Sequence, residues 1–115
     1  MTNKMGLKNG IKKSNELYER AKKVIASGTN TFSRAPGVFP DGVAPKFLVR
    51  QYGSHVWDVD DNEYIDMVMG CGPVTIGHNH PDINDAIKRQ LEKGILFSML
   101  NPLEVEVAEK LVDCI

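Results

Sequence analysis

The strongest constraint on the fold is a block of three short strand patterns in the middle of the chain. Residues 47–52, 55–59 and 63–69 are rich in valine, isoleucine and aromatic side chains. Only Gly53-Ser54 and the Asp60-Asp61-Asn62 turn separate them. Connections this short join antiparallel neighbours, because a parallel crossover needs about a dozen residues. The block therefore predicts a three-stranded antiparallel meander.

The segment before the strands predicts an arm, a helix and a long loop. Residues 1–13 are polar and have no hydrophobic period, so we expect a flexible arm. Ser14 is the expected N-cap of an amphipathic helix, and Gly28 is the expected stop. Residues 29–46 have no period and hold three of the six prolines. A loop this long in a compact domain is usually functional or flexible.

Two further helices are predicted after the strands. Pro81 suits the first position of one helix, which Gly94 ends. Asn101 and Glu104 have the spacing of a capping box at the start of the other. The apolar side of that last helix continues to Ile115, the final residue, with no stop signal. We therefore expect a fold that is truncated at this point.

Composition narrows the classes of protein. The chain has 115 residues, 42% hydrophobic and 25% charged, so we expect a folded domain with a hydrophobic core. Its net charge of −1 cannot supply the broad basic surface that nucleic acid requires. No apolar run reaches the length of a membrane span, and the start lacks a signal-peptide core. Two distant cysteines, Cys71 and Cys114, fit reduced thiols. We expect a cytoplasmic protein without a nucleic-acid or membrane partner.

Two clusters of potential metal ligands are better explained without a metal. Asp58, Asp60 and Asn62 have the spacing of the first three ligands of an EF-hand loop. The sixth position is Glu63 instead of glycine and the twelfth is Met69 instead of glutamate, which favours a polar hairpin turn.

His78 and His80 form the second cluster, with Cys71 and Asp82 nearby in sequence. Alternate residues of an extended segment point to opposite sides, so a single metal would require a bend. Imidazoles that hydrogen-bond loop backbone and cap the following helix are the favoured interpretation. We expect no metal site.

The glycine-rich run and one arginine are the remaining candidates. Residues 70–73, Gly-Cys-Gly-Pro, indicate that backbone passes close to a ligand or to another strand, and the residues alone leave both possibilities open. Arg34 is the lone cation in its loop, with Thr31 and Ser33 beside it. Its guanidinium is a fork of donors suited to a carboxylate or phosphate. On the residues alone, an ordinary surface arginine is favoured.

Five stretches of the sequence together resemble a known family. They are residues 17–21 (LYERA), 28–34 (GTNTFSR), 56–66 (VWDVDDNEYID), 72–81 (GPVTIGHNHP) and 103–109 (LEVEVAE). In register from about residue 14 to the end, they resemble the N-terminal part of glutamate-1-semialdehyde 2,1-aminomutase and related class III aminotransferases. The third and fourth stretches are specific in combination.

The resemblance implies an α+β fragment of the PLP-dependent transferase fold type I. It comprises an N-terminal helix, the small antiparallel three-stranded sheet and two helices. Residues 14–115 would be the N-terminal part of the fold, truncated before the large domain that binds pyridoxal 5'-phosphate (PLP). Such enzymes are usually homodimers. The implied activity moves an amino group on a small carbonyl or amino-acid-like substrate.

The resemblance also assigns roles to the candidates. Arg34 falls where the family binds a substrate carboxylate, with Thr31 beside it, and Cys71 and Gly72 fall near the cofactor. Cys71 replaces a typical tryptophan of the semialdehyde aminomutases, which favours a different small aldehyde or keto substrate.

PLP chemistry requires a lysine, a carboxylate and a phosphate cradle, all downstream in the family. We therefore expect no catalytic residue in this chain and no covalently bound PLP. The alternative is a small non-catalytic binding module with an anion pocket around Arg34.

Overall fold

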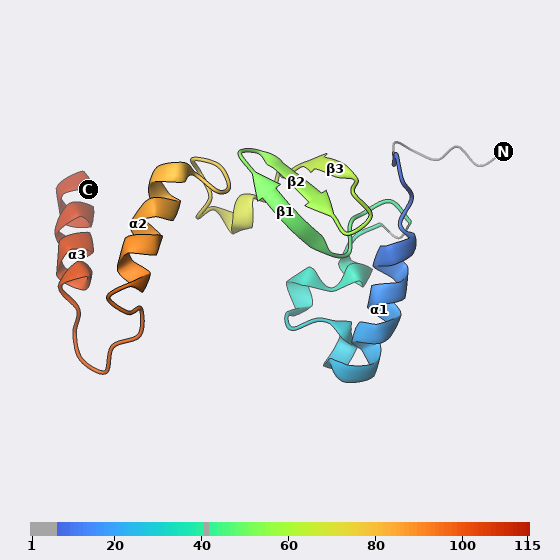
Figure 1. Cartoon of the computed structure of the whole chain (residues 1–115), viewed down its shortest axis with the longest axis horizontal. Helices are drawn as coiled ribbons and strands as arrows, with labels where there is room; N and C mark the ends of the chain where they lie inside the picture. The colour runs from blue at the N-terminus through green and yellow to red at the C-terminus, as the bar shows by residue number, and fades with distance from the viewer. Residues whose placement is uncertain (1–6, 41) are drawn as a thin grey trace. The chain divides into compact units, whose positions relative to one another are not determined.

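The structure, a computed structural model, describes residues 7–40 and 42–115 (Figure 1). The chain forms two units, residues 1–80 and 81–115. The first contains helix α1 and the sheet, and the second contains helices α2 and α3.

The predicted meander is confirmed, with a shorter third strand. Strands β1 (Leu48–Tyr52), β2 (His55–Asp58) and β3 (Glu63–Ile65) pair antiparallel in the order β1-β2-β3. We expected the third strand to reach residue 69, but it ends at Ile65. The side chain of Asp66 binds the N–H groups of Val68 and Met69, so these groups are not available to pair in the sheet. The chain instead continues into the 3-10 helix η4 (Met69–Cys71).

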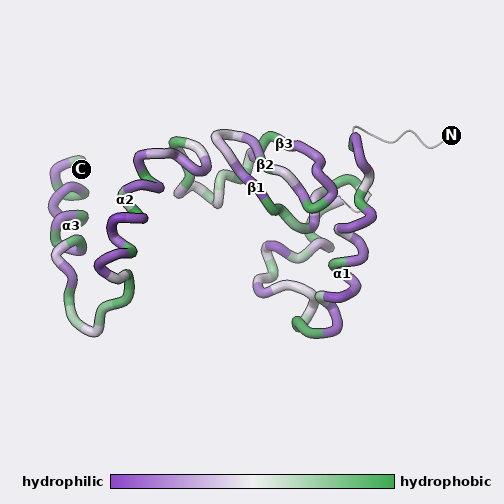
Figure 2. Tube along the Cα trace, in the orientation of Figure 1, coloured by the Kyte–Doolittle hydropathy of each residue, from purple (hydrophilic) through white to green (hydrophobic). Residues whose placement is uncertain are grey.

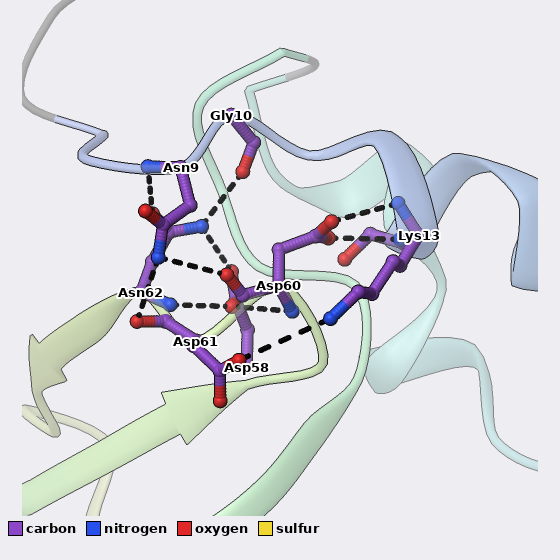
Figure 3. A network of polar contacts seen from close by, with 8 residues as sticks. Asn9, Gly10, Lys13, Asp58, Asp60, Asp61 and Asn62 are labelled. Atoms are coloured by element: carbon purple, nitrogen blue, oxygen red, sulfur yellow. Dashed lines mark hydrogen bonds and ion pairs between the residues drawn. The ribbon is translucent and has the colours of Figure 1, made fainter.

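Helix α1 (Lys12–Val24) begins before the expected N-cap. Its N-cap is Ile11, whose side chain makes no capping bond, so the expectation for Ser14 was wrong. The carboxylate of Asp60 caps the helix instead, accepting from the backbone N–H of Lys13 at 2.7 Å and of Ser14 at 2.9 Å (Figure 3). A carboxylate suits this place because it meets orphan N–H groups and the positive end of the helix dipole.

Part of the expected flexible arm is held by the same turn. The backbone N–H of Asn9 donates to Asn62 Oδ1 at 2.9 Å, and Asn62 Nδ2 donates to the carbonyl of Gly10 at 2.7 Å (Figure 3). The boundary at residue 13 therefore does not separate arm from fold. The beginning of the arm, residues 1–6, lies outside the described residues.

Helix α1 stops earlier than expected, and Gly28 has another role. The helix ends at Val24, and Gly28 closes the following 3-10 helix η1 (Ala26–Gly28) with φ +68°. A Cβ at Gly28 would lie 2.6 Å from Cε2 of Tyr18, so the aromatic ring excludes any side chain here. The loop that follows contains two short 3-10 helices, η2 (Phe32–Arg34) and η3 (Pro36–Val38), and matches the predicted irregular segment in its described part.

The second unit begins as the sequence predicts. Helix α2 (Pro81–Leu91) has Pro81 as its first residue, and α3 (Pro102–Cys114) carries the expected capping box. Asn101 Oδ1 accepts from the N–H of Leu103 at 3.0 Å, and the N–H of Asn101 donates to Glu104 at 2.9 Å. Every residue of α3 is exposed, including the apolar ones coloured green in Figure 2. No helix in residues 7–40 and 42–115 has the length and apolar character needed to cross a membrane.

The expected hydrophobic core is almost absent from the described residues. The buried apolar side chains there are Ala21 and Val56, whereas five polar residues are buried: Ser14, Asp58, Asp60, Asn62 and His78. The prediction of a core failed because the apolar faces of the helices are uncovered in this chain. A polar network therefore ties the start of α1 to the turn between β2 and β3.

Candidate functional site

Asp66 holds both ends of a loop formed by residues 67–77. One oxygen of its carboxylate, Oδ1, accepts from the N–H of Val68 at 2.9 Å and of Met69 at 3.1 Å. The other, Oδ2, lies 2.6 Å from Nε2 of His78. The side chains of His78 and Asp66 are only 7% and 14% exposed. A single, largely enclosed carboxylate thus binds two residues at the start of the loop and the residue that follows it.

The turn between β1 and β2 anchors this arrangement. Gly53 and His78 exchange two backbone hydrogen bonds, of 2.9 Å and 2.8 Å, and the N–H of Asp66 donates to the carbonyl of Ser54 at 2.8 Å. Gly77 has φ +96°, and a Cβ there would lie 3.2 Å from the Cα of Gly53. Glycine is favoured here, because a Cβ would crowd the Gly53 backbone and the positive φ would strain any other residue.

The backbone inside the loop is left-handed over four consecutive residues. The φ angles of Met69, Gly70, Cys71 and Gly72 are 47°, 63°, 64° and 118°. For a residue with a Cβ this conformation costs roughly 1–2 kcal/mol, so Met69 and Cys71 store strain. Cys71 is exposed, and a Cβ built on Gly72 meets nothing within 4 Å. The strained backbone is therefore open on one side, a combination that is typical of ligand sites.

The electrostatics of the loop depend on the hydrogen bond between Asp66 and His78. The hydrogen bond from His78 holds the pKa of Asp66 below its ordinary value, and the N–H groups of Val68 and Met69 add to this effect. Burial opposes them by disfavouring the charged form. The carboxylate therefore stays ionised at neutral pH and acts as an acceptor only.

The structure places Arg34 and Thr31 on a different loop. Thr31 precedes η2 and Arg34 ends it, and both are exposed. The N–H of Arg34 donates to the carbonyl of Thr31 at 3.2 Å, so their backbones are adjacent. Within the described part of the chain, the guanidinium makes no hydrogen bond or ion pair. The expected substrate pair and the expected cofactor-side residues therefore belong to different loops of the chain.

The turn at Asp58, Asp60 and Asn62 is structural. Asp58 Oδ1 accepts from the N–H groups of Asp60 and Asn62, and its Oδ2 accepts from the Asn62 amide, all at 2.8–2.9 Å (Figure 3). The Tyr64 hydroxyl also donates to Oδ2, at 2.8 Å. These four donors occupy the carboxylate, as the polar-turn interpretation requires. Burial and the bond to Asp58 raise the pKa of Tyr64. Across the residues that the structure describes, no three His, Cys, Asp or Glu side chains gather as metal ligands.

The histidines differ from the expectation. We expected both imidazoles to bond loop backbone, but His78 bonds the Asp66 carboxylate, and Nδ1 of His80 is buried without a hydrogen-bond partner among the described residues. Sequence reasoning missed Asp66 entirely as a site residue. Its distance of twelve positions from His78 follows no local rule, and the only available signal was that each residue falls within a stretch that resembles the family.

The loop would serve PLP as a lining surface and not as a covalent anchor. The open backbone at Cys71 and Gly72 leaves room for a flat ring or a phosphate. Covalent attachment requires a lysine, and the sequence has none between Lys46 and Lys88.

Comparison with known proteins gives one consistent family. Residues 39–115 match the family "Aminotransferase class-III". A curated glutamate-1-semialdehyde 2,1-aminomutase from Lachnoclostridium phytofermentans is 38% identical over 90% of this chain and 24% of its own length. An omega-transaminase from Sphaerobacter thermophilus is 34% identical, with a TM-score of 0.74 over 87% of this chain and 22% of its own.

A solved structure described as "Transaminase with PLP bound" is 35% identical, with a TM-score of 0.70 over 84% of this chain and 22% of its own. The chain thus spans about a quarter of the length of the curated relatives that it matches. These findings confirm the resemblance and the predicted fold class.

Proposed function

Because the chain belongs to the class III aminotransferase family, we propose that it is the N-terminal part of a PLP-dependent aminotransferase or aminomutase. The observation that carries the proposal is the family match over residues 39–115, together with 38% identity to an aminomutase over 90% of the chain. The complete enzyme would move an amino group on a small carbonyl or amino-acid-like substrate. We further propose that it acts in the cytoplasm as a homodimer.

The proposed cofactor is held by parts of the enzyme outside these residues. When bound, PLP supplies an electron sink for the bond that breaks next to the substrate nitrogen. The chain contributes the loop around Cys71 and Gly72, whose open backbone would line the cofactor side of the site. It contributes no covalent anchor, so alone it is proposed to be inactive.

Arg34 is proposed to bind the carboxylate of the substrate, with Thr31 beside it. The support is chemical: the guanidinium is exposed and makes no hydrogen bond or ion pair among the described residues. It offers a planar fork of donors that a carboxylate can fill with two parallel bonds. Such a clamp would orient the substrate relative to the cofactor. Cys71, which replaces a typical tryptophan, supports a substrate other than the semialdehyde.

The test of this role uses the complete polypeptide that carries the segment, loaded with PLP. Arg34→Ala should lower kcat/KM for carboxylate-bearing substrates by roughly 30- to several-thousand-fold, since removing one side of a buried charged pair costs about 2–5 kcal/mol. Arg34→Lys should recover little, because lysine lacks the bidentate fork. Arg20→Ala removes the same charge from an exposed position on α1 and should leave kcat/KM unchanged. A loss below about threefold for Arg34→Ala would make Arg34 a surface residue.

The reaction itself is tested by amino transfer from a small amine donor to carboxylate-bearing aldehydes and keto acids. Product formation that requires PLP supports the proposal. A polypeptide that binds carboxylates through Arg34 but transfers no amino group in the presence of PLP would instead be the binding module.

A further inference from the structure

The hydrogen-bonded pair of Asp66 and His78 lies outside the three strands, since Asp66 directly follows the last residue of β3. In the described residues most large apolar side chains are exposed, yet these two polar side chains are 14% and 7% exposed. Burial of such groups is costly unless they are hydrogen-bonded, and here the two atoms are 2.6 Å apart. We therefore ask which part of the chain this hydrogen-bonded pair holds in place.

What the pair secures is the loop of residues 67–77. The middle of this loop is open to solvent, because six of its residues are exposed: Gly70, Cys71, Gly72, Pro73, Thr75 and Ile76. Within it, the N–H of Cys71 bonds the carbonyl of Val68 at 2.9 Å, and that of Gly77 bonds the carbonyl of Val74 at 3.1 Å. The strained left-handed backbone is thus held by a few turn bonds and by its two clamped ends.

We propose that Asp66 and His78 are a positioning pair that fixes the loop so that the open backbone of Cys71 and Gly72 faces the cofactor in one orientation. The inference rests on the proposed function. Neither side chain needs to touch the cofactor, because both act through the loop that they close. Oδ1 of Asp66 sets where the loop leaves the sheet, and Oδ2 sets where it returns.

The first part of the test measures the loop in the 115-residue chain. Asp66→Asn keeps an oxygen for the N–H groups of Val68 and Met69 but loses the charge that faces His78. We expect amide hydrogen exchange in residues 67–77 to become at least about tenfold faster. The matched control is Glu63→Gln, which weakens another histidine–carboxylate contact, that of His55 with Glu63 at 2.8 Å, between side chains that are about half exposed. It should leave exchange in the loop unchanged.

The second part uses the complete polypeptide with PLP and separates positioning from simple stability. Asp66→Asn should shift the circular dichroism band of bound PLP and lower kcat at least about tenfold, with KM changed less than about threefold. A pair that only stabilised the fold would reduce the amount of folded enzyme without changing the signal per bound PLP. His78→Gln, which retains a donor, should recover part of the kcat that His78→Ala loses, and it serves as the test if Asp66→Asn does not fold.

The outcomes are distinct. Unchanged loop exchange in Asp66→Asn overturns the clamp, and faster exchange with an unchanged PLP signal and kcat overturns the positioning role. A wild-type polypeptide that binds no PLP refutes the proposed function, and this inference falls with it.

Discussion

Replacing Gly77 by alanine should open the loop at its anchor. Gly77 has φ +96°, and a Cβ at this position would lie 3.2 Å from the Cα of Gly53 and 3.3 Å from its carbonyl carbon and oxygen. These neighbours are backbone atoms held by two reciprocal hydrogen bonds between Gly53 and His78, so they cannot rotate away as a side chain would. The substitution must either strain the backbone or break the bridge.

Two costs add at this position. A left-handed backbone costs a residue with a Cβ roughly 1–2 kcal/mol, and overpacking against a fixed neighbour costs roughly 1–3 kcal/mol more. The free energy of unfolding should fall by about 2–5 kcal/mol in total. Gly10→Ala is the matched control, because Gly10 has φ +69° but nothing lies within 4 Å of a Cβ built there. Gly10→Ala should therefore lose only the roughly 1–2 kcal/mol of the left-handed backbone.

The assay combines urea unfolding with amide hydrogen exchange. The N–H groups of Gly53 and His78 report the bridge directly, and their protection should fall by about 30-fold or more in Gly77→Ala, since each 1.4 kcal/mol is a factor of about ten. In Gly10→Ala the same two amides should keep their protection. If Gly77→Ala loses no more stability than Gly10→Ala and keeps the bridge, the argument from close backbone approach is wrong.

Three further predictions concern the chain itself. The pKa values of Asp60 and Asp66 are lowered in the fold, so the two carboxylates stabilise it above about pH 4 and lose this effect as the pH falls through their folded pKa values. Acid unfolding, followed by circular dichroism, should therefore depend less on pH in the double variant Asp60→Asn, Asp66→Asn. An unchanged pH profile would contradict this. The isolated chain mixed with PLP should show no stoichiometric lysine-linked absorption band, and a band abolished by one lysine substitution would refute the expectation. Because α3 exposes Leu111, Val112 and other apolar side chains, sedimentation should show self-association, whereas a strictly monomeric, cooperatively unfolding species would argue against uncovered faces.

Elements set by neighbouring residues were predictable. The start of α2 at Pro81 and the capping box of Asn101 and Glu104 on α3 both appear in the structure as the sequence indicates. The antiparallel meander follows from its short turns. In each case the determining groups lie within a few positions of one another, so their interaction does not depend on the rest of the fold.

Features set by distant residues were not predictable. The start of α1 was misplaced because its cap is Asp60, 46 positions beyond the Ser14 N–H that it binds. The third strand is shorter than its sequence pattern predicts, because the Asp66 side chain binds the loop and His78 directly after β3. The expected core failed because periodicity shows which face of a helix is apolar but not what covers it.

The candidate site likewise has a part that the sequence predicts and a part that it does not. The sequence by itself determined the family, through stretches whose residue types and spacing are specific in combination, and it singled out Arg34, Thr31, Cys71 and Gly72. Only the tertiary structure decided how the loop beside Cys71 is held, because the Asp66 carboxylate reaches His78 only once the turn between β1 and β2 has brought their backbones together. A side-chain pair of this kind depends on a distance in space that no spacing along the chain encodes.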